Sequence, residues 1–146
     1  MLFTEYQKRY GMEDISILTD KDYSFFNKKV FNDDGKTFKS LINNPNNHIL
    51  IFNKGIVIFT VYDAENIDGF NDDRIALVYL LYKAKDSKID WNIAYNDFLE
   101  GLKLNGCTKM IMSTRIKPEF WINNYKFKLR KYEMELDLWR YMTKLL

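Results

Sequence analysis

The stretch Ile75-Ala-Leu-Val-Tyr-Leu-Leu-Tyr-Lys-Ala84 is a long apolar run, and the elements that follow it decide the fold. Its apolar residues stand at nearly every position, which predicts a strand buried on both faces of a sheet. The pattern Ser87-x-x-Asp90 then predicts a capped helix start. Apolar residues recur at helical spacing over residues 91–102, and Asn105-Gly106 predicts the helix end.

Three further elements complete this half of the chain. Residues 109–113 form a short apolar run that predicts a strand. Pro118 suits the first turn of a helix that runs to about Asn124. Residues 127–138 alternate between apolar and polar side chains and predict a strand, with a possible bulge at Lys131 and Tyr132, where the alternation changes phase.

The first half of the chain predicts two short helices and a hairpin. In order, we expect a strand at Ile15–Leu18, a Thr19-capped helix with Tyr23, Phe26 and Val30 inward, a helix around residues 38–42, hairpin strands at 49–52 and 56–62, and an acidic loop at 63–74. Residues 139–146 predict a terminal helix. The sum is an α/β fold with a mixed, mostly antiparallel sheet that helices cover on both faces.

Composition predicts one ordered domain spanning residues 1–146. With 47% hydrophobic and 16% aromatic residues, the 146-residue chain can bury a sizeable core. The net charge of +2 does not favour nucleic acid as a partner. The single Cys107 excludes an internal disulfide framework and suits a reducing compartment. No apolar run approaches the roughly 20 residues of a membrane helix, so we expect no membrane partner. We expect a location in the cytoplasm, or alternatively assembly into a particle that is made in a cytoplasm, such as a phage particle.

The sequence predicts no metal site. His48 is the only histidine, so a histidine-rich metal site cannot form within one chain. The acidic loop around Gly69 does not fit a calcium-binding loop, because Ala64 and Ile75 would occupy its first and last ligand positions. We expect this loop to be a solvated segment, or alternatively a patch that attracts a cationic partner.

Two segments carry a resemblance to a known family. Ile15-Ser-Ile-Leu-Thr-Asp-Lys-Asp-Tyr23 resembles an opening strand, a Thr-capped turn and an acidic helix start. Pro118-Glu-Phe-Trp-Ile-Asn-Asn-Tyr-Lys-Phe-Lys128 resembles a late helix that leads into the last hairpin. Together with the element order, they are similar to the GNAT superfamily of acyl-CoA-dependent N-acyltransferases. The resemblance covers nearly all of residues 15–138 and implies acetyl-CoA as cofactor and an amine as acceptor.

The resemblance also implies site residues. The central strand of the family binds the pantetheine arm through its backbone, and the following loop binds the pyrophosphate at a helix start. The matching positions here are Leu80, Leu81, Tyr82, Lys83, Ser87 and Lys88. Where the family often has a tyrosine that protonates the leaving thiolate, the nearest match is Trp121, which has no acidic hydroxyl, and Tyr125 one helical turn later is the candidate substitute. A general base would come from Asp63, Glu65 or another carboxylate of the loop.

The loop departs from the family pattern. Residues 86–91 contain no glycine, whereas glycines normally let the backbone approach the pyrophosphate. Asp86 and Asp90 would repel a diphosphate, and Ile89 and Trp91 are bulky. Two functions therefore stay open: N-acetyl transfer, or a non-catalytic GNAT-like protein of the kind found in phages, where some are virion components. In the second case, we expect residues 139–146 to bind a protein partner or mediate self-association.

Overall fold

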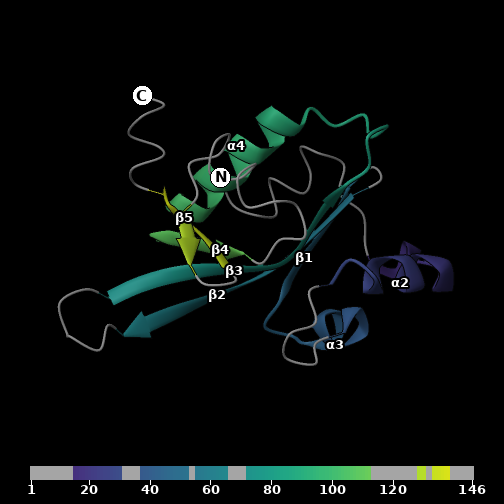
Figure 1. Ribbon diagram of the computed structural model, residues 1–146, viewed down its shortest axis with the longest axis horizontal. Coiled ribbons are helices and arrows are strands. Elements are labelled where there is room, and N and C mark those ends of the chain that lie inside the picture. The colour runs from purple at the N-terminus through teal and green to yellow at the C-terminus, as the bar shows by residue number, and fades with distance from the viewer. Residues whose placement is uncertain are drawn as a thin grey trace.

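The protein forms a six-stranded sheet with helices on both faces (Figure 1). The computed structural model describes residues 15–30, 37–52, 55–65, 72–112, 128–130 and 133–138. In chain order the elements are η1 (Ile15–Ile17), α2 (Asp20–Asn27), α3 (Phe38–Asn43), β1 (His48–Phe52), β2 (Gly55–Glu65), β3 (Asp72–Lys83), α4 (Trp91–Leu104), β4 (Lys109–Met112), β5 (Lys128–Arg130) and β6 (Glu133–Asp137). The prediction of an α/β fold is confirmed.

The sheet is mixed and mostly antiparallel. The described strands have the order β1-β2-β3-β4-β6-β5, and among them only β3 and β4 pair in parallel. The chain crosses between these two strands through α4, as parallel neighbours require. The predicted hairpin is confirmed, because β1 pairs antiparallel with β2 from His48↔Phe59 to Phe52↔Gly55.

The helix ends follow local sequence signals. Thr19 caps α2 in a capping box with Asp22, as predicted, and Thr37 caps α3 in a box with Ser40. The predicted end of α4 is also confirmed. Asn105 is the C-cap, and Gly106 adopts a φ of 85°, a left-handed conformation that glycine reaches without steric strain.

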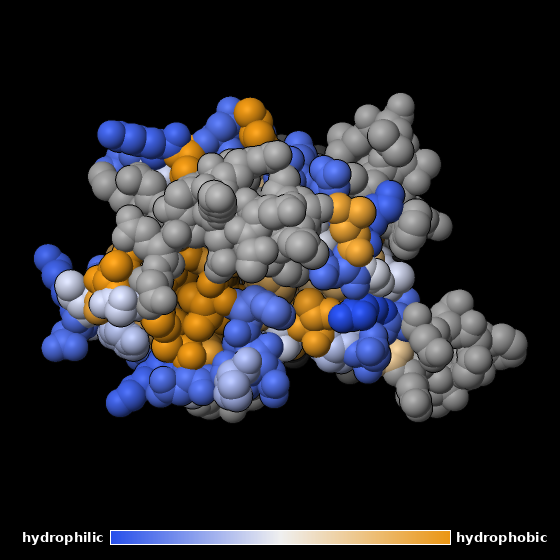
Figure 2. All heavy atoms as spheres, turned by 180° about the vertical axis from the view of Figure 1, so that it is seen from behind, coloured by the Kyte–Doolittle hydropathy of each residue, from blue (hydrophilic) through white to orange (hydrophobic). Residues whose placement is uncertain are grey.

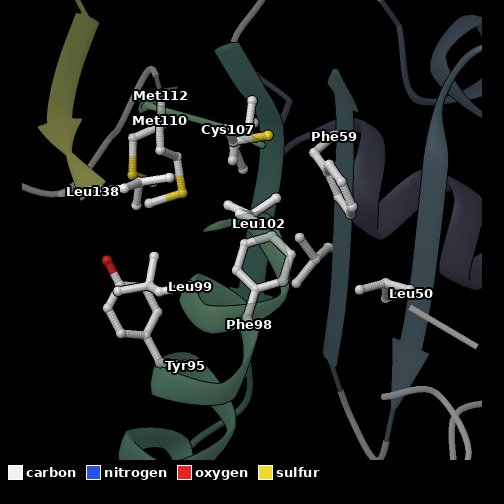
Figure 3. Close-up of a cluster of buried hydrophobic side chains, with 13 residues drawn as sticks. Leu50, Phe59, Tyr95, Phe98, Leu99, Leu102, Cys107, Met110, Met112 and Leu138 are labelled. Atoms are coloured by element: carbon white, nitrogen blue, oxygen red, sulfur yellow. The ribbon is translucent and has the colours of Figure 1, made fainter. Parts of the chain in front are cut away.

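One hydrophobic cluster lies between the sheet and α4 (Figure 3). The helix contributes Tyr95, Phe98, Leu99 and Leu102, while the strands contribute Leu50, Val57, Phe59, Ala76, Val78, Met110 and Met112; Cys107 and Leu138 complete it. The rings of Phe59 and Phe98 meet edge to face with centroids 5.2 Å apart. This cluster fixes α4 against the middle of the sheet.

A second cluster lies on the opposite face, under α2 and α3. It joins Phe26, Val30, Phe38 and Leu41 to Ile51, Ile56, Ile58 and Leu80 of the strands. The inward positions predicted for α2 are confirmed at Phe26 and Val30, which are buried, and at Tyr23, which packs against the cluster. Over Ile56–Phe59 both faces of β2 are therefore buried, as the continuous apolar sequence predicts, whereas Tyr62 further along the strand is exposed.

The predicted strand at Ile15–Leu18 is wrong. Residues 15–17 form a 3₁₀ turn, in which the Leu18 amide donates to the Ile15 carbonyl at 3.0 Å. Ile15 and Leu18 pack against the second cluster, while Ile17 is 48% exposed. Residues three apart eclipse in a 3₁₀ helix, so the apolar pair at 15 and 18 fits this turn better than it fits a strand.

The predicted acidic loop at 63–74 is wrong at both of its ends, and residues 66–71 lie outside the described residues. β2 continues to Glu65 and β3 begins at Asp72, so residues 63–65 and 72–74 extend the sheet as a two-stranded ribbon (Figure 1). Asp63 pairs across the strands with Arg74, with a Nε–Oδ1 distance of 4.0 Å. Asp73 lies 3.2 Å from the Lys109 ammonium and accepts a hydrogen bond from the Thr108 hydroxyl. The carboxylates at 63 and 73 are thus engaged in cross-strand contacts.

The single strand predicted over 127–138 is two strands. β5 and β6 pair antiparallel from Lys128↔Glu135 to Arg130↔Glu133, so residues 128–130 and 133–137 run in opposite directions. The bulge predicted at Lys131 and Tyr132 lies outside the described residues. The helix predicted from Pro118 and the helix predicted at 139–146 lie outside the described residues.

Exposed apolar side chains are spread over separate elements. The large ones are Ile17, Phe25, Tyr62, Ile93 and Leu104. Seen from behind, the described surface shows hydrophilic residues around its rim and smaller apolar patches between them (Figure 2). In the described part of the chain, no helix combines the length and the apolar character that crossing a bilayer requires.

Candidate functional site

The candidate site lies at the carboxyl end of β3, where the strand has an irregular residue. The β2–β3 register pairs Ile58 with Leu80 but Phe59 with Val78, which leaves Tyr79 as an extra residue. This is a β-bulge. Its effect is visible in the packing, since Tyr79 and Leu80 both contact the second cluster although they are consecutive. Residues 72–83 of β3 contain no glycine or proline, so the sequence gives no local signal for the bulge.

Within the described residues, the β3–β4 ladder runs from Ile75↔Lys109 to Val78↔Met112, whereas β3 continues to Lys83. In an antiparallel ladder, alternate residues direct their backbone groups towards one neighbouring strand or the other. Phe52 and Gly55 close the β1–β2 hairpin, so alternation directs Gly55 and Val57 towards β1. Leu81 and Lys83 lie opposite Val57 and Gly55, and their backbone groups therefore point away from β2, to the β4 side beyond the described β4 ladder.

The turn after β3 leads directly into α4. The Ser87 amide donates to the Ala84 carbonyl at 3.1 Å, and the Ile89 amide donates to the Ser87 hydroxyl at 3.4 Å. The prediction that Ser87 caps α4 is wrong. The N-cap is Asp90, three residues later, and Ser87 instead stabilises the turn before it.

The start of α4 is occupied by a carboxylate of the chain itself. Asp90 Oδ1 accepts hydrogen bonds from the Asn92 amide at 3.1 Å and the Ile93 amide at 3.3 Å. These are two of the first-turn amides that lack intrahelical acceptors and that bind an anion when a helix start serves as an anion site. An external phosphate would have to displace Asp90 and would then lie beside its charge.

Bulky side chains surround the same helix start. Ile89 and Trp91 are half-buried and pack against the first cluster, and Trp91 stacks on Tyr95 with centroids 5.6 Å apart. They are thus held by core contacts on both sides of Asp90. The residues at this turn do not fit a diphosphate, because the amides are capped, the cap is anionic and the flanking side chains are large.

Basic residues offset only part of the negative charge. Lys85 and Lys88 are exposed and Lys83 is half-buried, while the carboxylates Asp86 and Asp90 are exposed between and after them. The alternation of opposite charges over residues 83–90 leaves one net positive charge. Such mixed surface charge gives a weak, salt-sensitive attraction for anions rather than a focused field.

The structure brings most of the predicted cofactor-binding residues together. Leu80, Leu81, Tyr82 and Lys83 lie at the end of β3, and Ser87 and Lys88 lie in the turn that follows. Leu80 is buried in the second cluster, and Tyr82 packs edge to face on Phe25 with centroids 5.3 Å apart. Their side chains belong to the core, so any ligand contact from these two residues would come from the backbone.

Of the two predicted catalytic residues, Glu65 lies away from this site. It pairs with Asp72 at the far end of β2. It lies seven residues beyond Ile58, which corresponds to about 23 Å along a strand. Tyr125 lies outside the described residues, and its role as a proton donor stays a prediction.

Cys107 and His48 are the single cysteine and the single histidine of the chain, and Cys107 is buried in the core. Burial raises the pKa of the Cys107 thiol, the nearby Arg74 lowers it in part, and Asp63 raises it slightly, so the thiol stays protonated and unreactive. Desolvation lowers the pKa of His48, whose ring stacks on Phe59 at 5.0 Å. Within the described ranges, no group of three or more His, Cys, Asp or Glu side chains is arranged to hold a metal ion.

Comparison with protein-family models and with curated proteins gave no match. A function can therefore be inferred only from the sequence and the geometry of the chain itself.

Proposed function

We propose that this protein is a GNAT-like binding protein that has lost the diphosphate half of the acyl-CoA site and does not catalyse acyl transfer. The observation that carries this proposal is the Asp90 cap. Its carboxylate satisfies the Asn92 and Ile93 amides at 3.1 and 3.3 Å, at the helix start that the family resemblance assigns to the pyrophosphate.

Three features support the GNAT-like fold. A helix crosses between the only parallel pair of strands in the described sheet, β3 and β4. β3 continues to Lys83 beyond its described pairing with β4, and the resemblance assigns this end of the strand to backbone contacts with the cofactor. The element order from α2 to β4 also agrees with the order that suggested the resemblance. A role in binding proteins, including one in a phage particle, rests on the resemblance to small phage proteins.

Titration calorimetry with acetyl-CoA tests the loss of the diphosphate site. We expect no binding by the wild type up to millimolar concentration. The double variant Asp86→Arg/Asp90→Ser removes both carboxylates, adds a cation and keeps a hydroxyl to cap the helix, so we expect it to gain measurable affinity. Asp20→Ser is the matched control, because it removes an exposed carboxylate in the first turn of α2.

The outcomes separate clearly. Micromolar binding by the wild type, together with acetylation of an amine, would overturn the proposal. A gain in the double variant that is absent from Asp20→Ser would assign the lost site to the α4 start. An equal gain in acetyl-CoA affinity for both variants would show that the effect comes from the overall charge of the protein and not from the α4 start.

A second candidate is binding of a pantetheine-like arm along β3 without the diphosphate. The observation that favours it is the pair Leu81 and Lys83, whose backbone groups face the β4 side beyond the end of the ladder. Acetyl-pantetheine, which lacks the diphosphate and the nucleoside, is the probe for this candidate. Binding of this compound, detected as shifts of the Leu81 and Lys83 amide resonances, would support it.

A further inference from the structure

The end of α4 carries the only Asn-Gly pair of the chain, Asn105-Gly106. Asparagine is a labile residue, and it deamidates fastest before glycine, which has no side chain to hinder attack by its own backbone nitrogen. The fold requires glycine at this position, because Gly106 has a φ of 85°. Water can reach the pair, since Gly106 is exposed and Asn105 is half-buried.

Deamidation uses only atoms of this pair and water. A base removes the Gly106 amide proton, and the nitrogen attacks Cγ of Asn105. The new N–Cγ bond forms as the Cγ–Nδ2 bond breaks, and Nδ2 takes up a proton and leaves as ammonia. Water then opens the five-membered imide at either of its two carbonyls, which gives aspartate or isoaspartate at position 105. Both products replace a neutral amide with a carboxylate.

The closed end of α4 holds the reacting atoms apart. The Gly106 amide donates to the Lys103 carbonyl at 2.9 Å, so its proton is engaged in a backbone hydrogen bond. Asn105 has a ψ of 10°, which eclipses its own nitrogen with the nitrogen of Gly106 and leaves Cβ rotated away from that nitrogen. The leaving group is also fixed, because Asn105 Nδ2 donates to the Gly101 carbonyl at 2.7 Å.

We propose that Asn105-Gly106 is a deamidation site that the closed end of α4 protects and that opening of the last helical turn makes reactive. Ring closure requires rotation about the Cα–C bond of Asn105 until Cβ eclipses the Gly106 nitrogen. This rotation breaks the bond from the Gly106 amide to the Lys103 carbonyl, so the reaction cannot start from the closed helix end. The inference does not depend on whether acyl-CoA binds.

The products weaken the same helix end. A carboxylate at position 105 has no N–H to donate to the Gly101 carbonyl, and it adds negative charge where the last carbonyls of α4 already carry partial negative charge. Isoaspartate also inserts a backbone atom between Leu102 and Cys107, which are both buried and are joined by a bond from the Cys107 amide to the Leu102 carbonyl at 3.0 Å. Deamidation therefore converts a transient opening of α4 into a lasting one.

Peptide mapping by mass spectrometry tests the protection. The folded wild type and the guanidinium-unfolded wild type are incubated at the same mildly alkaline pH, and trypsin then releases residues 104–109 as one peptide, in which Asn105 is the only side-chain amide. We expect deamidation to be more than about tenfold slower in the folded protein, because only the open fraction can react. Equal rates in the two states would overturn the proposal.

Two glycine variants test whether the protection comes from the end of α4. Leu104→Gly loosens the last turn, and the matched control Ile93→Gly loosens the first turn; the two side chains are 64% and 56% exposed. The folded-state rate of each variant is divided by its own unfolded-state rate. We expect this ratio to rise several-fold for Leu104→Gly and to stay near the wild-type value for Ile93→Gly. An equal ratio for the two variants would overturn the role of the helix end.

Thermal unfolding at neutral pH tests the consequence of the modification. Asn105→Asp and Asn105→Ala both lose the bond to the Gly101 carbonyl, but only the first adds a charge beside the helix end. We therefore expect Asn105→Asp to unfold at a lower temperature than Asn105→Ala. A melting temperature for Asn105→Asp that equals or exceeds that of Asn105→Ala would overturn the inferred weakening of α4.

Discussion

The two halves of β3 differ in how the sheet holds them. Over Ile75–Val78 the strand pairs with β2 on one side and β4 on the other, and just before it Asp73 contacts Lys109 at 3.2 Å. Over Tyr79–Lys83 it begins with the bulge at Tyr79 and, among the described residues, pairs with β2 alone. The first half anchors the sheet, and the second presents backbone towards the side where the family resemblance implies a ligand.

The comparison also bears on the proposed loss of the diphosphate site. At the end of β3, Leu81 and Lys83 direct backbone groups to the side where the resemblance implies the pantetheine arm. At the α4 start, where the resemblance implies the pyrophosphate, Asp90 already accepts hydrogen bonds from the Asn92 and Ile93 amides. The strand end and the helix start therefore differ in whether their backbone groups are engaged by the chain itself.

Deleting single residues from β3 should give the largest effect. Deletion of Ala76, which is fully buried in the regular ladder, moves neighbouring side chains to the opposite face, so we expect the cooperative unfolding transition to be lost. Deletion of Tyr79 removes the bulge and leaves Val78, Leu80 and Leu81 on alternating faces, so we expect a folded protein. Thermal unfolding compares the two. If the variant that lacks Ala76 folds and the variant that lacks Tyr79 does not, the β2–β3 register and its bulge at Tyr79 would be contradicted.

The cap of α4 should have the next largest effect. We expect Asp90→Ala to lower the free energy of unfolding by about 1 kcal/mol, because two first-turn amides lose their acceptor. Ser87→Ala should change it by less than about 0.5 kcal/mol, because Ser87 is not the cap. Urea denaturation measures both. A larger loss of unfolding free energy for Ser87→Ala than for Asp90→Ala would identify Ser87 as the N-cap instead.

The ion pairs around the anchored half should have a smaller effect. Asp73 is partly buried and contacts both Lys109 and Thr108, so we expect Asp73→Asn to destabilise the protein by roughly 0.5–1 kcal/mol, less so at high salt. Asp63 has an 81% exposed side chain and lies 4.0 Å from Arg74, so Asp63→Asn is the control with little effect. Equal losses for the two variants in urea denaturation would contradict this ranking.

The smallest effect concerns pH. Desolvation lowers the pKa of His48 below its ordinary 6.5 in the folded protein, so the unfolded chain binds more protons in that range. The stability that His48 contributes is present above pH 6.5 and is lost as the pH falls through the lowered pKa. We expect a flatter stability profile for His48→Gln between neutral and mildly acidic pH. An unchanged slope in that variant would assign the dependence to other groups.

Sequence patterns predicted the regular parts of this fold because their signals are local or periodic. Each of these signals depends on a few neighbouring residues: the capping box at Thr19, the hairpin at residues 49–62 and the end of α4 at Asn105-Gly106. The four residues Ile15–Leu18 are too few to distinguish alternation from a 3₁₀ turn. The ribbon at Asp63 and Arg74 was predicted as a loop because acidic residues are depleted in strands, and only the cross-strand pairing shows their role.

The candidate site was less predictable for a physical reason. Ser87 and Asp90 both suit an N-cap, and the choice depends on where the helix begins, which core packing of Trp91 and Tyr95 decides. The bulge at Tyr79 depends on pairing with β2, which lies far away in the sequence. The separation between Glu65 and the end of β3 likewise follows from strand register.

The most direct test of the central claim compares the affinities of the wild type for acetyl-CoA and acetyl-pantetheine under the same conditions. The two ligands differ by the diphosphate and the nucleoside, which the Asp90-capped helix start does not accommodate. We therefore expect acetyl-CoA to bind no more tightly than acetyl-pantetheine. Binding of acetyl-CoA more than about tenfold tighter, a difference of about 1.4 kcal/mol, would contradict the account.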